Sequence, residues 1–174
     1  MSKTLIGNVH LPSIIQIGAG AVLKVGEVLS KLGLAYPLVV TDKNLIKLGH
    51  VKKLTDVLQQ NKLSWSIFDG TVEDPTDQCL SAGLKVFSSS PFDCIIGFGG
   101  GSPMDVAKTI SAMSVNTGSV KAYKAPRQIE KCGVPIILLP TTGGTGSEVT
   151  RWAVITDTKS NEKYNLSGAA LVAK

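Results

Sequence analysis

Short aliphatic runs alternate along the chain with stretches in which apolar residues recur every three or four positions. Such runs predict buried strands, and the three-to-four spacing predicts amphipathic helices. The predicted strands are residues 14–17, 37–41, 63–68, 94–97 and 134–139. The predicted helices are residues 21–32, 51–61, 76–88 and 103–113. The stretches 152–155 and 164–166 predict a short hairpin, and 116–132 is the longest irregular segment, which we expect at the surface.

This alternation of strands and helices indicates the fold class. The strands are unbroken aliphatic runs, which is typical of parallel strands covered on both faces. We therefore predict an α/β fold: a Rossmann-like, open and mostly parallel sheet with helices on both faces. A length of 174 residues suits one domain.

Composition and charge exclude several classes of function. The net charge is +5, but the basic residues are dispersed without a basic run, which argues against a nucleic-acid partner. The apolar segment 135–140 is too short to cross a membrane, and the start Met1–Gly7 lacks the apolar stretch of a signal peptide. Three scattered cysteines favour a reducing compartment. We expect a cytoplasmic protein.

The most informative segment joins the strand at 94–97 to the helix at 103–113. Gly97, Gly99, Gly100 and Gly101 follow the strand, and Ser102 is suited to cap the helix that Pro103 opens. Asp105 falls three residues after Ser102, as in a capping box. Amides at such a helix start can hold a pyrophosphate, and glycines let it approach closely. A tight turn without a ligand is the alternative, but consecutive glycines favour phosphate binding.

A second turn of this kind follows the strand at 134–139. Residues 140–150 are rich in glycine and hydroxyl side chains, and the sequence behind them is helical in pattern. Two such turns at strand ends would line one crevice of an open sheet, where ligands usually bind. Neither turn has the Gly-Lys-Ser/Thr ending of an NTPase phosphate loop. Gly18-Ala-Gly20 lacks the third glycine of the dinucleotide fingerprint, and we interpret it as a simple turn.

Asp42 ends the predicted strand at 37–41. A carboxylate there can accept both hydroxyls of an adenine ribose. It would also repel the 2′-phosphate of NADP, since like charges about 4 Å apart cost roughly 4 kcal/mol at an effective dielectric near 20. Asp42 therefore favours NAD over NADP. Capping of a helical turn at 43–48 is an alternative role, and the two roles are compatible.

Taken together, the two turns resemble the paired signatures of the iron-containing (group III) alcohol dehydrogenase family. The signatures are Gly99-Gly-Gly-Ser-Pro-Met-Asp105 and Pro140-Thr-Thr-Gly-Gly-Thr-Gly-Ser-Glu-Val-Thr150, and other short motifs fall in the expected order. The resemblance covers nearly the whole chain. It implies a dehydroquinate synthase-like N-terminal domain that binds NAD(P). Glycerol dehydrogenases share the glycine turn but lack the Thr-Thr-rich turn in this form.

The resemblance also implies roles for particular residues. Asp42 would hold the adenosine ribose, and Gly99, Gly100, Gly101 and Ser102 the pyrophosphate. Asp105 would lie near the point where nicotinamide and substrate meet. The remaining cofactor residues would be Thr141, Thr142 and Thr145 on the adenine side, with Thr150, Trp152 and Lys163 flanking the rest. One departure is Asp74, where family members often carry Asn.

The family binds iron or zinc through one Asp and three His of a second, helical domain. Here the only histidines are His10 and His50, far apart and in no ligand-like pair. We therefore expect residues 1–174 to be the cofactor-binding domain of an NAD(P)- and metal-dependent alcohol dehydrogenase that acts on a small alcohol or aldehyde. The second domain would be absent, so this chain alone would neither bind the metal nor turn over substrate.

Two alternatives stay open: a non-catalytic nucleotide-binding module from a truncated chain, and a domain of a glycerol-dehydrogenase-like enzyme. We also expect self-association, because the stub at 166–173 would expose apolar area that a second domain would cover.

Overall fold

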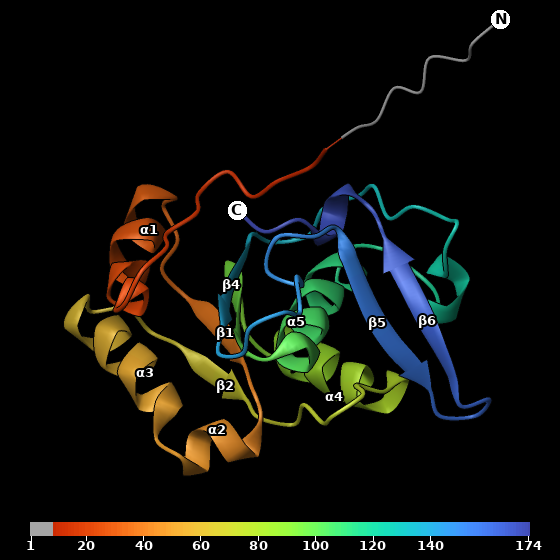
Figure 1. Ribbon diagram of the computed structural model, residues 1–174, viewed down its shortest axis with the longest axis horizontal. Helices are drawn as coiled ribbons and strands as arrows, with labels where there is room; N and C mark the ends of the chain where they lie inside the picture. The colour runs from red at the N-terminus through yellow and green to blue at the C-terminus, as the bar shows by residue number, and fades with distance from the viewer. Residues whose placement is uncertain (1–8) are drawn as a thin grey trace, which may run out of the picture.

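The computed structural model describes residues 9–174 (Figure 1), so the expectation drawn from Met1–Gly7 lies outside the described residues. The strands are β1 (Pro37–Val40), β2 (Ser66–Phe68), β3 (Cys94–Gly99), β4 (Ile136–Pro140), β5 (Trp152–Asp157) and β6 (Glu162–Ser167). The helices are α1 (Val25–Lys31), α2 (Lys43–Lys47), α3 (His50–Gln60), α4 (Asp77–Ser88) and α5 (Gly101–Met113). Among the described residues, no helix is long and apolar enough to cross a membrane.

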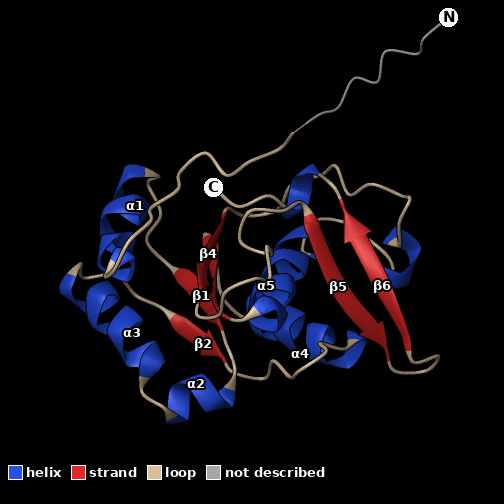
Figure 2. Cartoon of the chain, viewed as in Figure 1, coloured by secondary structure: helices blue, strands red, loops and turns tan. Residues whose placement is uncertain are grey.

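The centre of the molecule is a parallel sheet in the order β2-β1-β3-β4 (Figure 2). Leu38 of β1 lies opposite Ile95 of β3, and Ile95 lies opposite Ile136 of β4. Helices α1 and α3 cover one face of the sheet, and α4 and α5 cover the other (Figure 1). The predicted α/β fold, with a parallel sheet between helices, is confirmed.

Successive side chains of the strands enter different halves of the core, because side chains alternate between the two faces of a sheet. On β1, Leu38 and Val40 pack with α4 and α5, whereas Val39 packs with α1 and α3. In β1 and β3 both faces are buried, which is why these strands are nearly continuous apolar runs in the sequence. The apolar stripe of α3 is Val51, Leu54, Val57 and Leu58.

The predicted hairpin is present as the antiparallel pair β5–β6, and it packs against α5 outside the main sheet (Figure 1). Ala153, Ile155, Tyr164 and Leu166 point inward and join the core beside α5. Residues directly opposite in an antiparallel pair share a face. Lys163, opposite Thr156, therefore lies on the other face of the hairpin.

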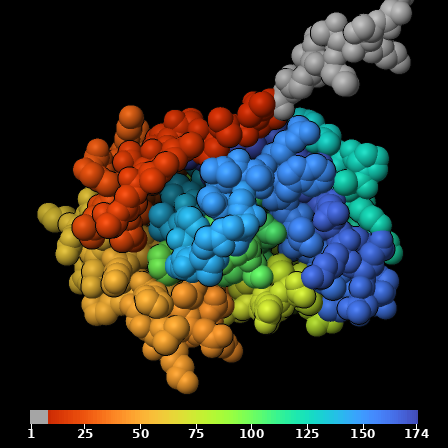
Figure 3. All heavy atoms as spheres, viewed as in Figure 1, coloured from red at the N-terminus to blue at the C-terminus, as the bar shows by residue number. Residues whose placement is uncertain are grey.

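The predicted strand at 14–17 is wrong. These residues form no strand, and Ile15 and Ile17 are 51% and 93% exposed. An aliphatic run becomes a strand only where a neighbouring strand pairs with it, and the red N-terminal residues instead cross the surface (Figure 3). The turn interpretation of Gly18-Ala-Gly20 is confirmed: Gly20 has φ 81° and begins a 3-10 turn at Ala21–Lys24.

The segments expected at the surface are better packed than the sequence predicted. In 116–132, Val120, Tyr123 and Ile129 are buried in the core, so this segment is not a simple surface excursion. The stub at 166–173 is also packed: Leu171 is fully buried, and the Lys174 amide donates to the Ile136 carbonyl at 2.9 Å. The expected exposed apolar stub is therefore wrong, because the tail runs along the edge of β4.

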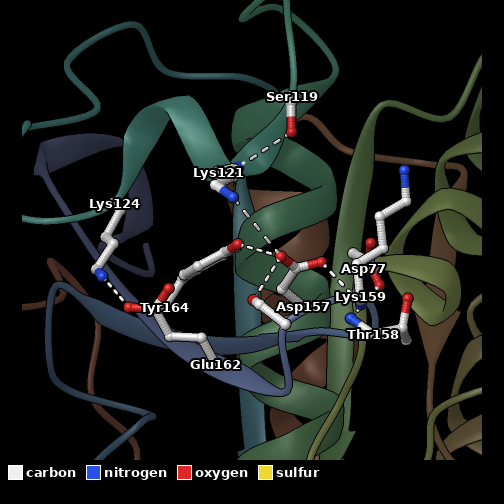
Figure 4. Close-up of polar contacts among 10 residues, drawn as sticks. Asp77, Ser119, Lys121, Lys124, Asp157, Thr158, Lys159, Glu162 and Tyr164 are labelled. Carbon is white, nitrogen blue, oxygen red and sulfur yellow. Dashed lines mark hydrogen bonds and ion pairs between the residues drawn. The ribbon is translucent and has the colours of Figure 1, made fainter.

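The closed end of the hairpin is tied together by the buried carboxylate of Asp157 (Figure 4). It accepts hydrogen bonds from the Tyr164 hydroxyl at 2.5 Å, the Ser160 hydroxyl at 2.8 Å and the Lys159 amide at 3.2 Å. The hydrogen bond from Tyr164 is the largest cause that lowers the pKa of Asp157, to about 2. The neighbouring Thr158 amide donates to Asp77 at 3.1 Å, which joins the hairpin to the start of α4.

Candidate functional site

A hollow of about 610 Å³ lies where β1, β2, β3 and β4 end. The carboxyl ends of parallel strands meet at one edge of a sheet, and ligands of open α/β sheets bind there. The lining residues are Asp42, Lys43, Asn44, Leu45, Asp69, Gly70, Thr71, Val72, Glu73, Gly100, Gly101, Ser102, Pro103, Thr141 and Thr142. Both glycine-containing turns therefore contribute to one crevice, as the sequence predicted.

Asp42 is the second residue after the end of β1, and it lines this hollow. Its Oδ1 accepts a hydrogen bond of 3.0 Å from the Leu45 amide and so caps α2. The capping role suggested by the sequence is confirmed. A carboxylate has further lone pairs after one such bond, so capping leaves capacity for a ligand hydroxyl. The contact with a ribose stays a prediction.

The glycines of this turn form two pairs: Gly97 and Gly99 lie within β3, and Gly100 and Gly101 follow it. A Cβ at Gly97 would lie 2.9 Å from the Ala107 Cβ and 3.1 Å from the Met104 Cα, so Gly97 lets α5 pack closely on β3. Gly99 has φ 149°, and a Cβ there would lie 2.7 Å from Pro103. At Gly101 the nearest atom would be the Thr145 Cβ, at an ordinary 3.6 Å. The fold therefore requires glycine at 97 and 99, but not at 101.

Gly100 belongs with Gly101. Its φ of −76° suits any residue, and a Cβ there would meet, among the described residues, only the end of the Thr142 side chain, at 3.3 Å. Since packing does not explain these two glycines, the space in front of them is free for a ligand that approaches the backbone.

Helix α5 begins at Gly101, earlier than the sequence predicted, and its N-cap is Gly100. Ser102 was expected to be the cap and instead occupies the first turn of the helix. The first backbone amides of a helix lack intrahelical partners and carry a partial positive charge. Within residues 9–174, no side chain caps this end of α5. The amides at the glycine turn thus remain available for an anion, as at other phosphate-binding helix starts.

The expected capping box at Asp105 is wrong, because its carboxylate is occupied by distant partners. Oδ1 accepts from the Ser147 hydroxyl, and Oδ2 accepts from the Val154 amide at 2.9 Å. Burial raises the pKa of Asp105, while these two hydrogen bonds oppose the shift. Asp105 therefore joins α5 to the Thr-rich turn and to β5.

Lys108 extends this network. It is fully buried and donates to the Trp152 carbonyl at 2.6 Å and to the Ser147 hydroxyl at 3.3 Å. Burial lowers the pKa of Lys108 to about 8, against the opposing charges of Asp105 and Glu148. This role could not be predicted from local sequence patterns, because the partners of Lys108 lie about forty residues further along the chain.

The Thr-rich turn contributes unevenly to the hollow. Thr141 and Thr142 line it, and the Thr141 amide donates to the Gly99 carbonyl at 2.9 Å, which joins the two turns. Thr145 lies beside Gly101 and caps the turn by accepting from the Ser147 amide at 3.2 Å. The helix expected behind this turn is absent: residues 141–151 form only turns and bends.

Other predicted cofactor residues do not line the hollow. Thr150 is half-buried, and Trp152 is 44% exposed at the start of β5. Lys163 forms an exposed ion pair with Asp74 at 2.7 Å. Sequence reasoning missed Asp69, Gly70 and Thr71, although they follow β2 as Asp42 follows β1.

A divalent metal does not fit the described residues. In residues 9–174 no three His, Cys, Asp or Glu side chains gather as a metal site would require. His10 and His50 are both exposed.

Comparison with known proteins identifies the family. The family model described as iron-containing alcohol dehydrogenase matches residues 12–174. The chain belongs to this family. Within the iron-containing alcohol dehydrogenases, it is 40% identical over 149 residues to the lactaldehyde reductase of Escherichia coli K12, covering 84% of this chain and 39% of that protein. It is 36% identical over 156 residues to the NAD-dependent methanol dehydrogenase of Bacillus methanolicus, covering 90% of this chain and 41% of that protein.

Solved structures of iron-containing alcohol dehydrogenases share the fold. A 1,3-propanediol oxidoreductase superimposes with a TM-score of 0.90 at 32% identity, covering 97% of this chain and 44% of that chain. The sulfoacetaldehyde reductase of Bifidobacterium kashiwanohense, solved with NAD⁺, gives a TM-score of 0.88 at 25% identity, covering 98% of this chain and 45% of that chain. The chain therefore spans about two fifths of the length of these two curated relatives, the lactaldehyde reductase and the methanol dehydrogenase.

Proposed function

We propose that this chain binds NAD and serves as the cofactor domain of an oxidoreductase that interconverts small alcohols and aldehydes. The observation that carries the proposal is the hollow at the strand ends, bordered by Gly100 and Gly101 at an uncapped start of α5. A pyrophosphate needs backbone amides that it can approach closely, and these glycines leave that approach open. Membership of the iron-containing alcohol dehydrogenase family supplies the reaction class.

In this proposal, different residues of the site contact different parts of the cofactor. The pyrophosphate lies against the amides of Gly100, Gly101 and Ser102, and the adenosine ribose lies against Asp42. Thr141 and Thr142 contact the adenine side, with Thr145 behind Gly101. Thr150, Trp152 and Lys163 flank the more distant part of the cofactor, and Asp105 acts through Ser147 and Val154 by holding the Thr-rich turn in place.

NAD is preferred over NADP in this proposal, because a 2′-phosphate beside Asp42 would meet a like charge. Two comparisons support NAD: the related methanol dehydrogenase is named as NAD-dependent, and the related sulfoacetaldehyde reductase was solved with NAD⁺. NAD is the cofactor named for those two relatives. For this chain, the proposed preference for NAD over NADP rests on Asp42.

Hydride transfer from an alcohol needs stabilisation of the developing alkoxide, which a Lewis-acidic metal supplies when it is bound. The described residues contain the hollow proposed to bind the nucleotide, but no group of three His, Cys, Asp or Glu side chains that could hold a metal ion. We therefore propose that this chain by itself binds cofactor but does not turn over short alcohols. Added iron or zinc should not change that result.

We also propose that the chain self-associates. The surface proposed is the N-terminal segment, in place of the stub at 166–173 that the sequence indicated. The exposed large apolar side chains concentrate in the N-terminal segment, where Val9, Ile17 and Leu23 are 82%, 93% and 67% exposed. Of these three, Ile17 lines a hollow of about 540 Å³ beside β4. Apolar surface of this kind favours contact between molecules, and light scattering of Ile17→Ser against the unsubstituted chain would test it.

Calorimetric titration with NADH tests the central proposal. The expected result is saturable binding at a single site, which ADP displaces because it carries the same ribose and phosphates. Absence of NADH binding, or binding that ADP leaves unaffected, would contradict a dinucleotide site in this hollow. An activity assay with short alcohols and added metal then separates cofactor binding from catalysis.

A further inference from the structure

Thr71 follows β2 and is one of the lining residues of the hollow. The residue is only 5% exposed, and its Oγ1 has no protein hydrogen-bond partner among the described residues. A buried hydroxyl without a partner is unfavourable, so each such group calls for an explanation. Valine has nearly the same shape and would avoid the unpaired hydroxyl, so packing alone does not account for threonine at this position.

Backbone contacts place Thr71 beside Asp42. Gly70 forms an isolated bridge with Asp42, and the Thr71 amide donates to the Thr41 carbonyl at 3.4 Å. The segment after β2 is therefore fixed against the residues that follow β1. Gly100 and Thr142 line the same hollow. Thr71 thus lies in the part of the site where the proposed ribose and pyrophosphate would meet.

Thr41 provides an internal comparison. Its Oγ1 is likewise buried without a protein partner, and the residue is fully buried. Thr41 does not line the hollow, whereas Thr71 does. A threonine changes between staggered χ1 positions by exchanging its hydroxyl and its methyl group. Because Thr71 lines the hollow and Thr41 does not, such a rotation would turn a hydroxyl towards the hollow at Thr71 but not at Thr41.

From this contrast we infer that Thr71 is a cofactor-binding residue whose hydroxyl bonds an oxygen of the dinucleotide next to Asp42. The inference rests on the proposed function, since it assumes that a dinucleotide fills the hollow. The shared chemistry is a hydrogen bond to an oxygen atom, which can belong to a ribose hydroxyl or to a phosphate. The hydroxyl has no protein partner among the described residues, and a bound dinucleotide would supply one.

The test is calorimetry with NADH on the unsubstituted chain, Thr71→Val and the matched control Thr41→Val. Thr71→Val should weaken NADH binding by about three- to tenfold, as expected for one lost neutral hydrogen bond. Its thermal midpoint should be unchanged or higher, because an unpaired buried hydroxyl is removed. Thr41→Val should leave NADH affinity unchanged. Equal affinities of Thr71→Val and the unsubstituted chain, or an equal loss in both variants, would overturn the inference.

Titrations with ADP and with 2′-deoxy-ADP distinguish the two oxygen sources. If Thr71→Val weakens ADP but not 2′-deoxy-ADP, the partner is the ribose 2′-hydroxyl. If it weakens both, the partner is another oxygen shared by the two nucleotides, such as one of a phosphate. If it weakens neither, Thr71 does not contact this half of the cofactor and the inference fails. Failure of the unsubstituted chain to bind NADH at all would instead contradict the proposed function.

Discussion

The carboxylate of Asp105, on α5, accepts a hydrogen bond of 2.9 Å from the backbone amide of Val154, on β5. The other carboxylate oxygen accepts from Ser147, which also receives a hydrogen bond from the buried Lys108. These contacts join the helix that begins at the glycine turn to the Thr-rich turn and the hairpin. They connect the two sides of the proposed cofactor site through one buried polar network.

Replacing Asp105 should therefore destabilise the fold. Asp105→Ala leaves the Val154 amide and the Ser147 hydroxyl without their acceptor, and we expect a loss of about 2–4 kcal/mol in the free energy of unfolding. Ser147→Ala should cost about 1 kcal/mol. In the double variant the two losses should not add, because both remove the same hydrogen bond. Urea denaturation of the three variants measures this, and an Asp105→Ala loss below about 0.5 kcal/mol would argue against the network.

Asp157 should make stability depend on acidic pH. Its pKa is lowered to about 2 from an ordinary 3.8, chiefly by the hydrogen bond from Tyr164. A carboxyl group with a lowered pKa in the folded state stabilises fully above its ordinary pKa, and this contribution is lost as the pH falls through about 2.

The matching experiment follows the thermal midpoint from neutral to acidic pH. Asp157→Asn should lower the midpoint at neutral pH and show a smaller further fall below about pH 4 than the unsubstituted chain. Asp56→Asn is the control, because it removes an exposed carboxylate paired with Lys52 within α3. Identical pH profiles for Asp157→Asn and the unsubstituted chain would rule out the proposed role of Asp157.

The proposed role of Asp42 in cofactor preference can be tested with a variant that keeps the N-cap of α2. Its Oδ1 accepts from the Leu45 amide at 3.0 Å, and serine is also a good N-cap. Asp42→Ser should therefore keep stability within about 0.5 kcal/mol while it removes the charge that faces a 2′-phosphate. We expect the ratio of NADH to NADPH affinity to fall by roughly tenfold or more.

Two outcomes would show that Asp42 serves only as a cap. In one, the unsubstituted chain binds both cofactors equally. In the other, Asp42→Ser and the unsubstituted chain discriminate equally between them. Calorimetric titrations with each cofactor measure these affinities directly.

The sequence predicted the sheet well because its strands are marked by local patterns. Leu38, Val39 and Val40 are all buried, and three consecutive aliphatic residues predict a buried strand. Asp42 was expected at the end of that strand. The run at 14–17 carries the same local pattern without a pairing strand, so local pattern alone misled the prediction. Asp105 was misread as part of a capping box, because its true partners lie 42 and 49 residues away in the sequence.

Part of the site was also predicted correctly, because local sequence signatures mark it. Gly100, Gly101, Thr141 and Thr142 were expected from two local signatures, and the structure brings them to one hollow. Thr71 was missed because its relevance depends on the loop after β2 crossing towards Asp42, which is a long-range relationship. The buried packing of the tail against β4 is likewise a tertiary effect.

The glycine turn at the start of α5 is proposed to bind the cofactor pyrophosphate, and the variant Gly101→Ala tests this claim. A Cβ there would lie 3.6 Å from Thr145, an ordinary contact, and alanine favours helix over glycine. The matched control is Gly97→Ala, whose Cβ would lie 2.9 Å from Ala107 and should destabilise the fold. The measurement is NADH affinity by calorimetry, with thermal unfolding of each variant recorded alongside. We predict that Gly101→Ala keeps or raises the thermal midpoint yet weakens NADH binding by roughly tenfold or more, as one impaired charge-assisted hydrogen bond implies. Unchanged NADH affinity in a stable Gly101→Ala protein would contradict the claim.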